Sequence, residues 1–215
     1  MMSFATLPGG STMRRLRAHG WGIFVTPEAI ERNRPAWRWS QEGASPMPYA
    51  GDNGAWSAFV NGTTWDPAGF VELLDEAGEL AVFVAVPDIV EGGLDSLEHS
   101  RRWLPRVLER SRRALVVVQD GMSFEDVRPM LSGRVGVFVG GSTEWKESTL
   151  KPWAALAQRC GAWCHVGRVN SVRRINMCTN SGVDSIDGTS AVRFSSNIGK
   201  LDGARRQLSF IGEME

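Results

Sequence analysis

The chain has 215 residues, 42% of them apolar, and 24 Lys and Arg balance 24 Asp and Glu to a formal net charge of zero. Its size and apolar content fit one globular domain, and we expect a single domain over residues 1–215. The neutral charge excludes tight binding of nucleic acid by charge alone, and no apolar run reaches the ~18 residues of a membrane span.

The N-terminus and the cysteines both favour an intracellular protein. The opening residues Met-Met-Ser-Phe-Ala lack the basic, apolar and cleavage regions of a secretory signal. Cys160, Cys164 and Cys178 are odd in number and irregularly spaced, which favours ordinary thiols over a disulfide framework. We therefore expect a soluble, cytoplasmic protein with no membrane partner.

The first part of the chain has weak strand patterns. Residues 21–25 predict a strand, and residues 3–7 and 57–61 are weaker candidates. Residues 35–54 are rich in Pro, Gly, Ser and Trp and predict a long loop. The basic run at residues 13–17 favours a solvated helix edge over a nucleic-acid arm.

Helices and strands alternate from residue 66 onward. Asp66 and Pro67 are typical of a helix start, because an N-cap aspartate and a proline in the first turn precede apolar residues on one face. Further helices are predicted over residues 94–113, 148–160 and 170–178, and Pro105 should kink or divide the first of them. Short apolar runs predict strands at residues 80–86, 114–118, 135–139, 163–166 and 183–186.

This alternation is typical of βαβ units around a parallel sheet. With the weaker candidates included, eight strands are predicted, enough to close a (β/α)8 TIM-like barrel. Because 215 residues leave little room for each unit, we expect an α/β barrel that is compact and either trimmed or irregular.

Polar residues and glycines follow the predicted strands, at the ends where parallel α/β folds place reactive groups. Carboxylates can accept from N–H donors and glycines admit backbone amides, so the set predicts a cup for a flat, purine-like base. Each residue taken singly is most often part of a simple turn, so the prediction depends on their recurrence. Those after the strands are Asp88, Gln119, Gly140, Gly141, Gly167, Arg168 and Asp187, and the early loop adds Asp52 and Trp56.

Two motifs near the end of the chain resemble a known family. His-Val-Gly-Arg at residues 165–168 and Gly-Val-Asp-Ser-Ile-Asp at residues 182–187 are similar to motifs of tRNA-guanine transglycosylases and of their phage and bacterial relatives that insert 7-deazaguanines into DNA. The resemblance implies that Asp187 attacks the anomeric carbon of the sugar and forms a covalent glycosyl ester. It also implies that Asp184 is structural.

Other positions follow the same family in chain order. Gly-Asp-Asn-Gly-Ala-Trp at residues 51–56 resembles the family's Asp-Ser-Gly-Gly-aromatic loop, although Asn53 and Ala55 depart from the usual residues. The resemblance implies that Asp52 handles a proton of the incoming base and that Trp56 stacks on this base. Further base contacts are implied for Asp88, Gln119, Gly140, Gly141, Val166 and Gly167.

The resemblance covers residues 52–196, and one feature of the tRNA enzymes is missing. No cluster of three cysteines and a histidine follows Asp187, so the chain lacks their zinc subdomain and is most similar to the DNA-modifying branch, often encoded by phages. This implies guanine-containing DNA and a free 7-deazaguanine base as partners, no cofactor and no metal, and a host cytoplasm if a phage encodes the chain. Phosphate contacts are expected from Arg168, Arg173, Arg174 and Arg193.

Three alternatives stay open: a transglycosylase acting on tRNA or other RNA, a non-catalytic nucleic-acid-binding subunit of such an enzyme, and an unrelated metal-dependent barrel hydrolase. The presence of both Asp52 and Asp187 argues against the second. The third would need more histidine ligands than His19, His99 and His165. For His165 a packed histidine is favoured over an acid–base group. The exact deazapurine, the target sequence and the oligomeric state are not indicated.

Overall fold

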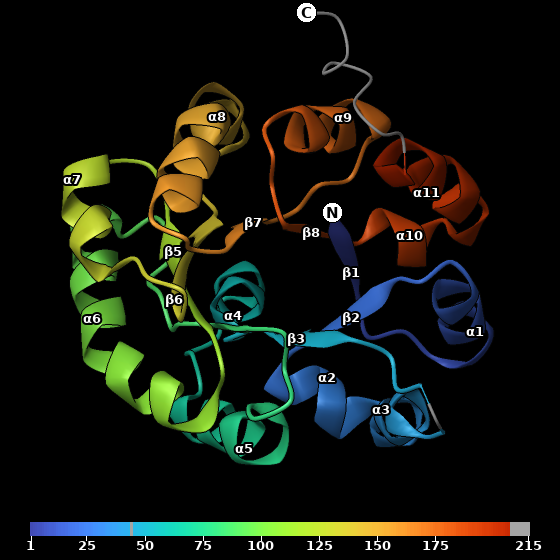
Figure 1. Ribbon diagram of the computed structural model, residues 1–215. Helices are drawn as coiled ribbons and strands as arrows, with labels where there is room; N and C mark the ends of the chain where they lie inside the picture. The colour runs from blue at the N-terminus through green and yellow to red at the C-terminus, as the bar shows by residue number, and fades with distance from the viewer. Residues whose placement is uncertain (44, 207–215) are drawn as a thin grey trace, which may run out of the picture.

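The computed structural model describes residues 1–43 and 45–206. Eight parallel strands form a closed barrel in chain order, and β8 pairs with β1 to complete it. Figure 1 looks down the barrel, with the strands at the centre and most helices in a ring around them. The prediction of a (β/α)8 TIM-like barrel is confirmed.

The strands are short and almost entirely buried. They are β1 (Met2–Thr6), β2 (Gly22–Val25), β3 (Tyr49–Gly51), β4 (Val84–Ala85), β5 (Ala114–Val118), β6 (Val135–Val139), β7 (Cys164–Val166) and β8 (Ser185–Gly188). The α-helices are α1 (Gly10–Ala18), α2 (Pro27–Arg32), α3 (Arg34–Gln41), α4 (Ala55–Asn61), α5 (Pro67–Ala77), α6 (Gly93–Arg110), α7 (Phe124–Val127), α8 (Thr143–Arg159), α9 (Val172–Asn180), α10 (Ser190–Arg193) and α11 (Ile198–Arg206). Two 3₁₀ turns complete the set, η1 (Arg128–Met130) and η2 (Ser195–Asn197).

The protein has two hydrophobic cores. The larger lies between the strands and the surrounding helices, and the smaller fills the barrel itself with aromatic side chains, chiefly Phe4, Phe24 and Phe83. Gly22 makes room for this interior, because a Cβ at that position would stand 2.6 Å from the ring of Phe4. The barrel is therefore closed below its C-terminal end by packed rings.

Two predictions for the first part of the chain are wrong. Residues 57–61 lie in the helix α4 and not in a strand, since Gly54 and Gly62 flank a short helix with φ values of 80° and 64° that glycine adopts readily. Residues 35–54 are not a single loop, because they contain most of α3 and all of β3. A strand of three residues is too short for its periodicity to be recognised in a sequence.

Predictions in the second half need smaller corrections. Helix α6 runs unbroken past Pro105, so the predicted division of this helix is wrong. Pro105 is exposed, so water can satisfy the carbonyl that loses its helical partner. Strand β8 ends at Gly188, and Asp187 consequently lies inside this strand and not after it.

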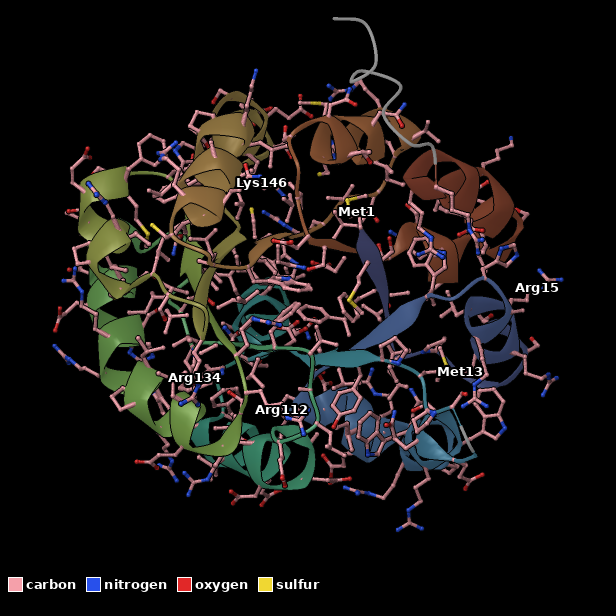
Figure 2. All side chains as sticks on the ribbon, viewed as in Figure 1. Met1, Met13, Arg15, Arg112, Arg134 and Lys146 are labelled. Carbon is pink, nitrogen blue, oxygen red and sulfur yellow. The ribbon has the colours of Figure 1, made fainter. Side chains whose placement is uncertain are left out.

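Helix α1 has an amphipathic arrangement. Met13 is buried and points from α1 toward the barrel, whereas Arg15 is exposed at the periphery (Figure 2). This arrangement agrees with the interpretation of residues 13–17 as a helix edge. Within residues 1–43 and 45–206, no helix has both the length and the apolar character needed to cross a membrane.

Candidate active site

A cavity of about 900 Å³ opens at the C-terminal ends of the strands, which is the size of a typical small-molecule site. Phe24 and Phe138 from the barrel interior form part of its floor. The predicted site residues that line it are Asp52, Trp56, Asp88, Gln119, Gly140, Gly141, Arg168 and Asp187. The barrel therefore brings together residues that are more than 130 positions apart in the chain.

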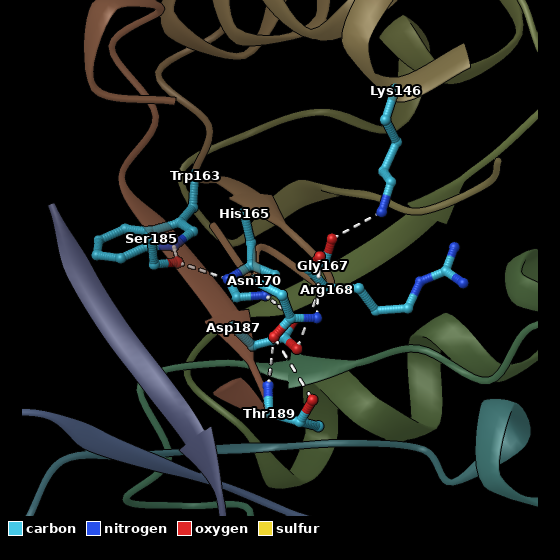
Figure 3. Close-up of polar contacts among 9 residues, drawn as sticks. All are labelled: Lys146, Trp163, His165, Gly167, Arg168, Asn170, Ser185, Asp187 and Thr189. Carbon is cyan, nitrogen blue, oxygen red and sulfur yellow. Dashed lines mark hydrogen bonds and ion pairs between the residues drawn. The ribbon is translucent and has the colours of Figure 1, made fainter. Parts of the chain in front are cut away.

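Asp187 lies at the bottom of this cavity and is 8% exposed. Its Oδ1 is 3.0 Å from Nε2 of His165, and its Oδ2 accepts a hydrogen bond of 3.3 Å from the backbone amide of Arg168 (Figure 3). The longer contact leaves Oδ2 the less engaged of the two oxygens. One carboxylate oxygen is thus held by a side chain while the other is available to a ligand.

His165 is completely buried in β7, directly below Asp187. Its Nδ1 lies 2.8 Å from Oγ of Ser185, which also accepts a hydrogen bond of 2.8 Å from Nε1 of Trp163. Burial lowers the pKa of His165, and the nearby Asp187 only partly offsets this. The imidazole is therefore neutral at physiological pH, and both of its nitrogens have a partner.

Asp52 and Asp88 form the opposite wall of the cavity. Burial raises the pKa of Asp52 to about 7, and the negative charges of Asp187 and Asp88 add to this rise. Burial likewise raises the pKa of Asp88 to about 6. Because these values lie close to neutrality, both carboxyl groups can take up or release a proton at physiological pH.

Asn53 connects these two aspartates and was not identified from the sequence as a site residue. Its Nδ2 donates to Oδ1 of Asp88 and to the carbonyl of Val86, each at 2.8 Å, and its Oδ1 accepts from the amide of Ala55 at 2.8 Å. The contact with Asp88 lowers the pKa of that carboxyl and opposes the larger effect of burial. Asn53 thus anchors the loop after β3 to the loop after β4.

A third group of contacts fixes the loops after β5 and β6. Asp120 accepts hydrogen bonds of 2.7 Å from both the amide and the hydroxyl of Ser142, the N-cap residue of α8. Gly141, in the loop after β6, has a φ of 72°, and a Cβ there would collide with Asp120. The side-chain amide of Gln119 donates to the carbonyl of Ile89 at 2.9 Å, so its Oε1 is the end available to the cavity.

Arg168 spans the cavity mouth from the loop after β7. Its guanidinium lies 4.1 Å from the ring centroid of Trp56 and donates to the carbonyl of Gly141. Trp56 is 42% exposed, so one part of its ring is covered by Arg168 and another faces outward. Such a cation–π pair can bind a flat base or a phosphate at the same edge.

The remaining predicted residues lie elsewhere. Val166 and Gly167 line a small separate cavity beside α8, although a Cβ on Gly167 would come within 3.4 Å of Asp187 Oδ1. Arg173 and Arg174 both pair with Glu147. Arg193 is exposed at the end of α10. Among these arginines only Arg168 reaches the main cavity.

Lys146 of α8 is a further buried group that the sequence did not single out. Its Nζ donates to the carbonyl of Gly167 at 2.8 Å (Figure 3). Burial lowers its pKa to about 8, with Arg168 contributing and Asp187 opposing. The lysine supports the turn that carries the amide of Arg168 toward Asp187. No pattern marks it, because Lys146 is one ordinary polar position within a helix.

Asp184 and the cysteines have roles outside the main cavity. Oδ2 of Asp184 accepts the backbone amide of Cys164 at 2.8 Å, a contact that ties β7 to the start of β8. Cys160, Cys164 and Cys178 are free thiols. In the described parts of the chain, no three His, Cys, Asp or Glu side chains come together as ligands for a metal ion.

The chain matches no model of a known protein family, and no curated protein is significantly similar to it in sequence.

Proposed function

We propose that this protein is a base-exchange transglycosylase that replaces guanine in DNA with a 7-deazaguanine derivative. The observation that carries the proposal is the convergence of Asp187, Asp52 and Asp88 from three different strand ends on one cavity. A buried carboxylate with one oxygen held and one oxygen available suits a nucleophile. Two carboxyl groups with raised pKa values suit proton transfer to and from a purine.

In the first step, Oδ2 of Asp187 attacks C1′ of the deoxyribose, and the C1′–N9 bond breaks with its electron pair passing to guanine. Protonated Asp52 supplies the proton with which guanine leaves as a neutral base. An anion beside the sugar stabilises the oxocarbenium character of the transition state, as in retaining glycosidases. The products are a glycosyl ester on Asp187, the carboxylate of Asp52 and free guanine.

In the second step, the carboxylate of Asp52 removes the proton from N9 of the incoming 7-deazaguanine. The nitrogen attacks C1′, and the ester bond to Asp187 breaks with its electron pair returning to the carboxylate. Two inversions preserve the β configuration, and Asp52 is again protonated. A pKa of about 7 lets one group act as acid and then as base.

Recognition of the base follows from the groups around it. The carboxylate of Asp88 can accept from the N–H groups on the guanine edge, and the free Oε1 of Gln119 provides a second acceptor. The backbone at Gly140 and Gly141 closes the cavity beside them. Trp56 provides an aromatic surface at the mouth, where an unpaired base can stack.

Guanine in a duplex cannot reach Asp187 while it is stacked, so we propose that the target nucleotide is unpaired or flipped out of the helix. Arg168 is placed to contact its phosphate, since it extends across the mouth of the cavity. RNA remains a second candidate substrate for the same chemistry. The free thiols suit a reducing cytoplasm, in which we place the activity.

The proposal is tested by incubating the protein with guanine-containing DNA and, separately, with tRNA, each with candidate 7-deazaguanines, followed by mass spectrometry of the nucleosides. We expect incorporation into DNA and release of guanine. Without an incoming base, denaturing gels should show a covalent protein–DNA adduct. Exchange on tRNA alone would redirect the proposal to RNA, and exchange on neither would refute it.

Two variants make this test specific. Asp187→Asn should abolish both the adduct and the exchange. Asp184→Asn is the matched control, because this aspartate lies three positions earlier, outside the cavity lining, and an asparagine oxygen can still accept the amide of Cys164. If Asp187→Asn kept full exchange activity, another residue would be the nucleophile.

A further inference from the structure

A ladder of polar side chains crosses the otherwise aromatic interior of the barrel. Trp163 and His165 lie two residues apart, just before and within β7. Ser185 and Asp187 lie two residues apart in β8, and the register of the two strands pairs His165 with Ser185. Residues two apart in a strand share a face, so all four point inward. Figure 3 shows them in sequence from Trp163 through Ser185 and His165 to Asp187.

Each contact in this ladder is within hydrogen-bonding distance, and together they define a direction. The indole N–H of Trp163 can only donate, so Ser185 Oγ accepts from it at 2.8 Å. The one proton of the Ser185 hydroxyl is then free to be donated to Nδ1 of His165, 2.8 Å away. Nε2 of a neutral imidazole so bonded carries the ring proton, which points at Asp187 Oδ1 over 3.0 Å.

The opposite direction would demand a different protonation of the site. With the proton on Nδ1, the Ser185 oxygen would receive two donors, and bare Nε2 would need a protonated carboxyl group opposite it. The surroundings oppose this arrangement. The amide of Arg168 donates to Oδ2, and the cations Lys146 and Arg168 both lie close enough to interact with Asp187.

Within residues 1–43 and 45–206, the polar side chains that contact the His165 ring are those of Ser185 and Asp187. Its ring is enclosed by Phe138 and Phe83, with centroid distances of 4.5 and 4.8 Å, and by Phe24 at 5.8 Å and Phe4 at 6.3 Å. The charged groups that act on it are Asp187 and Lys146. Because the aromatic enclosure keeps the imidazole neutral and in place, its N–H is aimed permanently at one oxygen.

We propose that His165 is a positioning residue for Asp187. Trp163, Ser185 and His165 form a one-way chain of donors that holds Oδ1 of the carboxylate, keeps it anionic and leaves Oδ2 directed at the sugar. The role assigned to Oδ2 rests on the proposed function, whereas the direction of the hydrogen bonds from Trp163 to Asp187 does not. His165 transfers no proton in this scheme, so it differs from the acid–base role of a catalytic histidine.

The direction of these hydrogen bonds is tested by nitrogen-15 NMR of the histidine rings. The signal of His165 is assigned as the one that disappears in the His165→Phe variant. We expect the neutral form with the proton on Nε2 at neutral pH, because burial lowers the pKa of His165. A proton on Nδ1 or a protonated ring at neutral pH would each overturn the proposal.

Base exchange provides the second readout. His165→Phe fits the aromatic enclosure but lacks the donor, and we expect kcat to fall about 10- to 100-fold with little change in KM, the size of a hydrogen bond to a charged group. Its activity should also decline at a higher pH on the acid side. His165→Gln, which can present an N–H to Oδ1, should restore most of kcat. Equal loss in both variants, or a pH profile that does not move, would contradict a positioning role.

The two readouts separate this inference from the proposed function. If the wild type shows no base exchange with any substrate, the proposed function fails, while the NMR measurements still decide the direction of the chain. Ser185→Ala guards against misfolding of the His165 variants, because it removes the donor to Nδ1 without touching the ring. In this variant we expect the proton to stay on Nε2, opposite Asp187, and the Nδ1 resonance to shift because Nδ1 has lost its donor. An Nδ1 resonance identical to that of the wild type would also overturn the proposal.

Discussion

Asp187 in β8 and Asp52 after β3 line the same cavity, but their carboxyl groups have different surroundings. Asp187 faces the side chain of His165 and the amide of Arg168, with Lys146 nearby. Asp52 accepts from the amide of Gly54 at 3.3 Å and faces two other carboxylates, and burial raises its pKa to about 7. One side of the cavity therefore stabilises an anion, and the other favours a proton.

This difference shows how one side-chain type can perform two tasks in a single site. Neighbouring donors suit Asp187 to attack carbon, whereas burial beside like charges suits Asp52 to exchange protons. The two are also coupled, because the charge of Asp187 helps to raise the pKa of Asp52. A substitution of Asp187 should therefore change the pKa of Asp52. The expected effects of the substitutions below range from a loss of activity to a change in the pH dependence of stability.

The largest effect should come from Asp187→Asn. We expect base exchange to fall at least about 1,000-fold, since loss of a nucleophile removes the covalent route. Removing the negative charge should also lower the pKa of Asp52 below about 7, which carbon-13 NMR of the carboxyl groups can follow. An unchanged titration of Asp52 would show that the carboxyl groups of Asp52 and Asp187 do not interact.

Asp52→Asn should reduce base exchange by about 100-fold, the usual contribution of a general acid–base group. It should also change stability. Because the pKa of Asp52 is raised from 3.8 to about 7 in the folded state, stability is lost as the pH rises through this range. At pH 8 we expect the variant to be more stable than the wild type by on the order of 2 kcal/mol.

Urea unfolding at pH 4 and pH 8 checks this prediction, since the difference between the two proteins should vanish at the lower pH. If the free energies of unfolding of the wild type and Asp52→Asn differed by the same amount at pH 4 and pH 8, the pKa of Asp52 would not be raised.

Arg168→Ala should weaken DNA binding about 10-fold. It should also reduce the slope of the logarithm of the binding constant against the logarithm of the salt concentration by about one, which corresponds to the loss of one phosphate contact. The reason is that Arg168 alone among the predicted phosphate-binding arginines lines the cavity. Fluorescence anisotropy over a series of salt concentrations measures both quantities. Arg110→Ala, at the far end of α6, is the control, and an equal loss in both variants would exclude a specific role for Arg168.

The smallest of these effects should come from Lys146→Met. Burial lowers the pKa of Lys146 from 10.5 to about 8, so the folded state releases its proton before the unfolded state does. Wild-type stability should therefore rise between about pH 8 and pH 10, by on the order of 1 kcal/mol relative to the variant. Thermal unfolding at these values measures the difference, and parallel pH curves would contradict it.

The second half of the barrel could be predicted well because its strands are continuous apolar runs. The expected strands at residues 114–118 and 135–139 coincide with β5 and β6. The first half was harder, since β3 has only three residues and α4 has a pattern that a short strand could share. Trimmed elements in a small barrel leave too few residues for periodicity to distinguish helix from strand.

The candidate site shows the same division. Asp88 and Asp187 were identified because polar residues follow apolar runs, and Asp52 because its loop resembles a family motif; both signals are visible along the chain. Asn53 was seen only as a departure from a motif, although it holds Asp88 in place. The sequence does place His165 two residues after Trp163, a spacing that puts both side chains on one face of a strand. Which face of β7 points into the barrel is defined only once the barrel closes.

By itself the sequence determined the alternation of strands and helices and the residues at the strand ends, because both depend on local patterns. Only the tertiary structure decided which carboxyl groups meet, what surrounds each of them and which of them has a raised pKa. Distances across the barrel depend on its closure, and burial depends on every neighbour at once. The chemistry of a carboxyl group is set by these long-range contacts, which no local pattern of residues records.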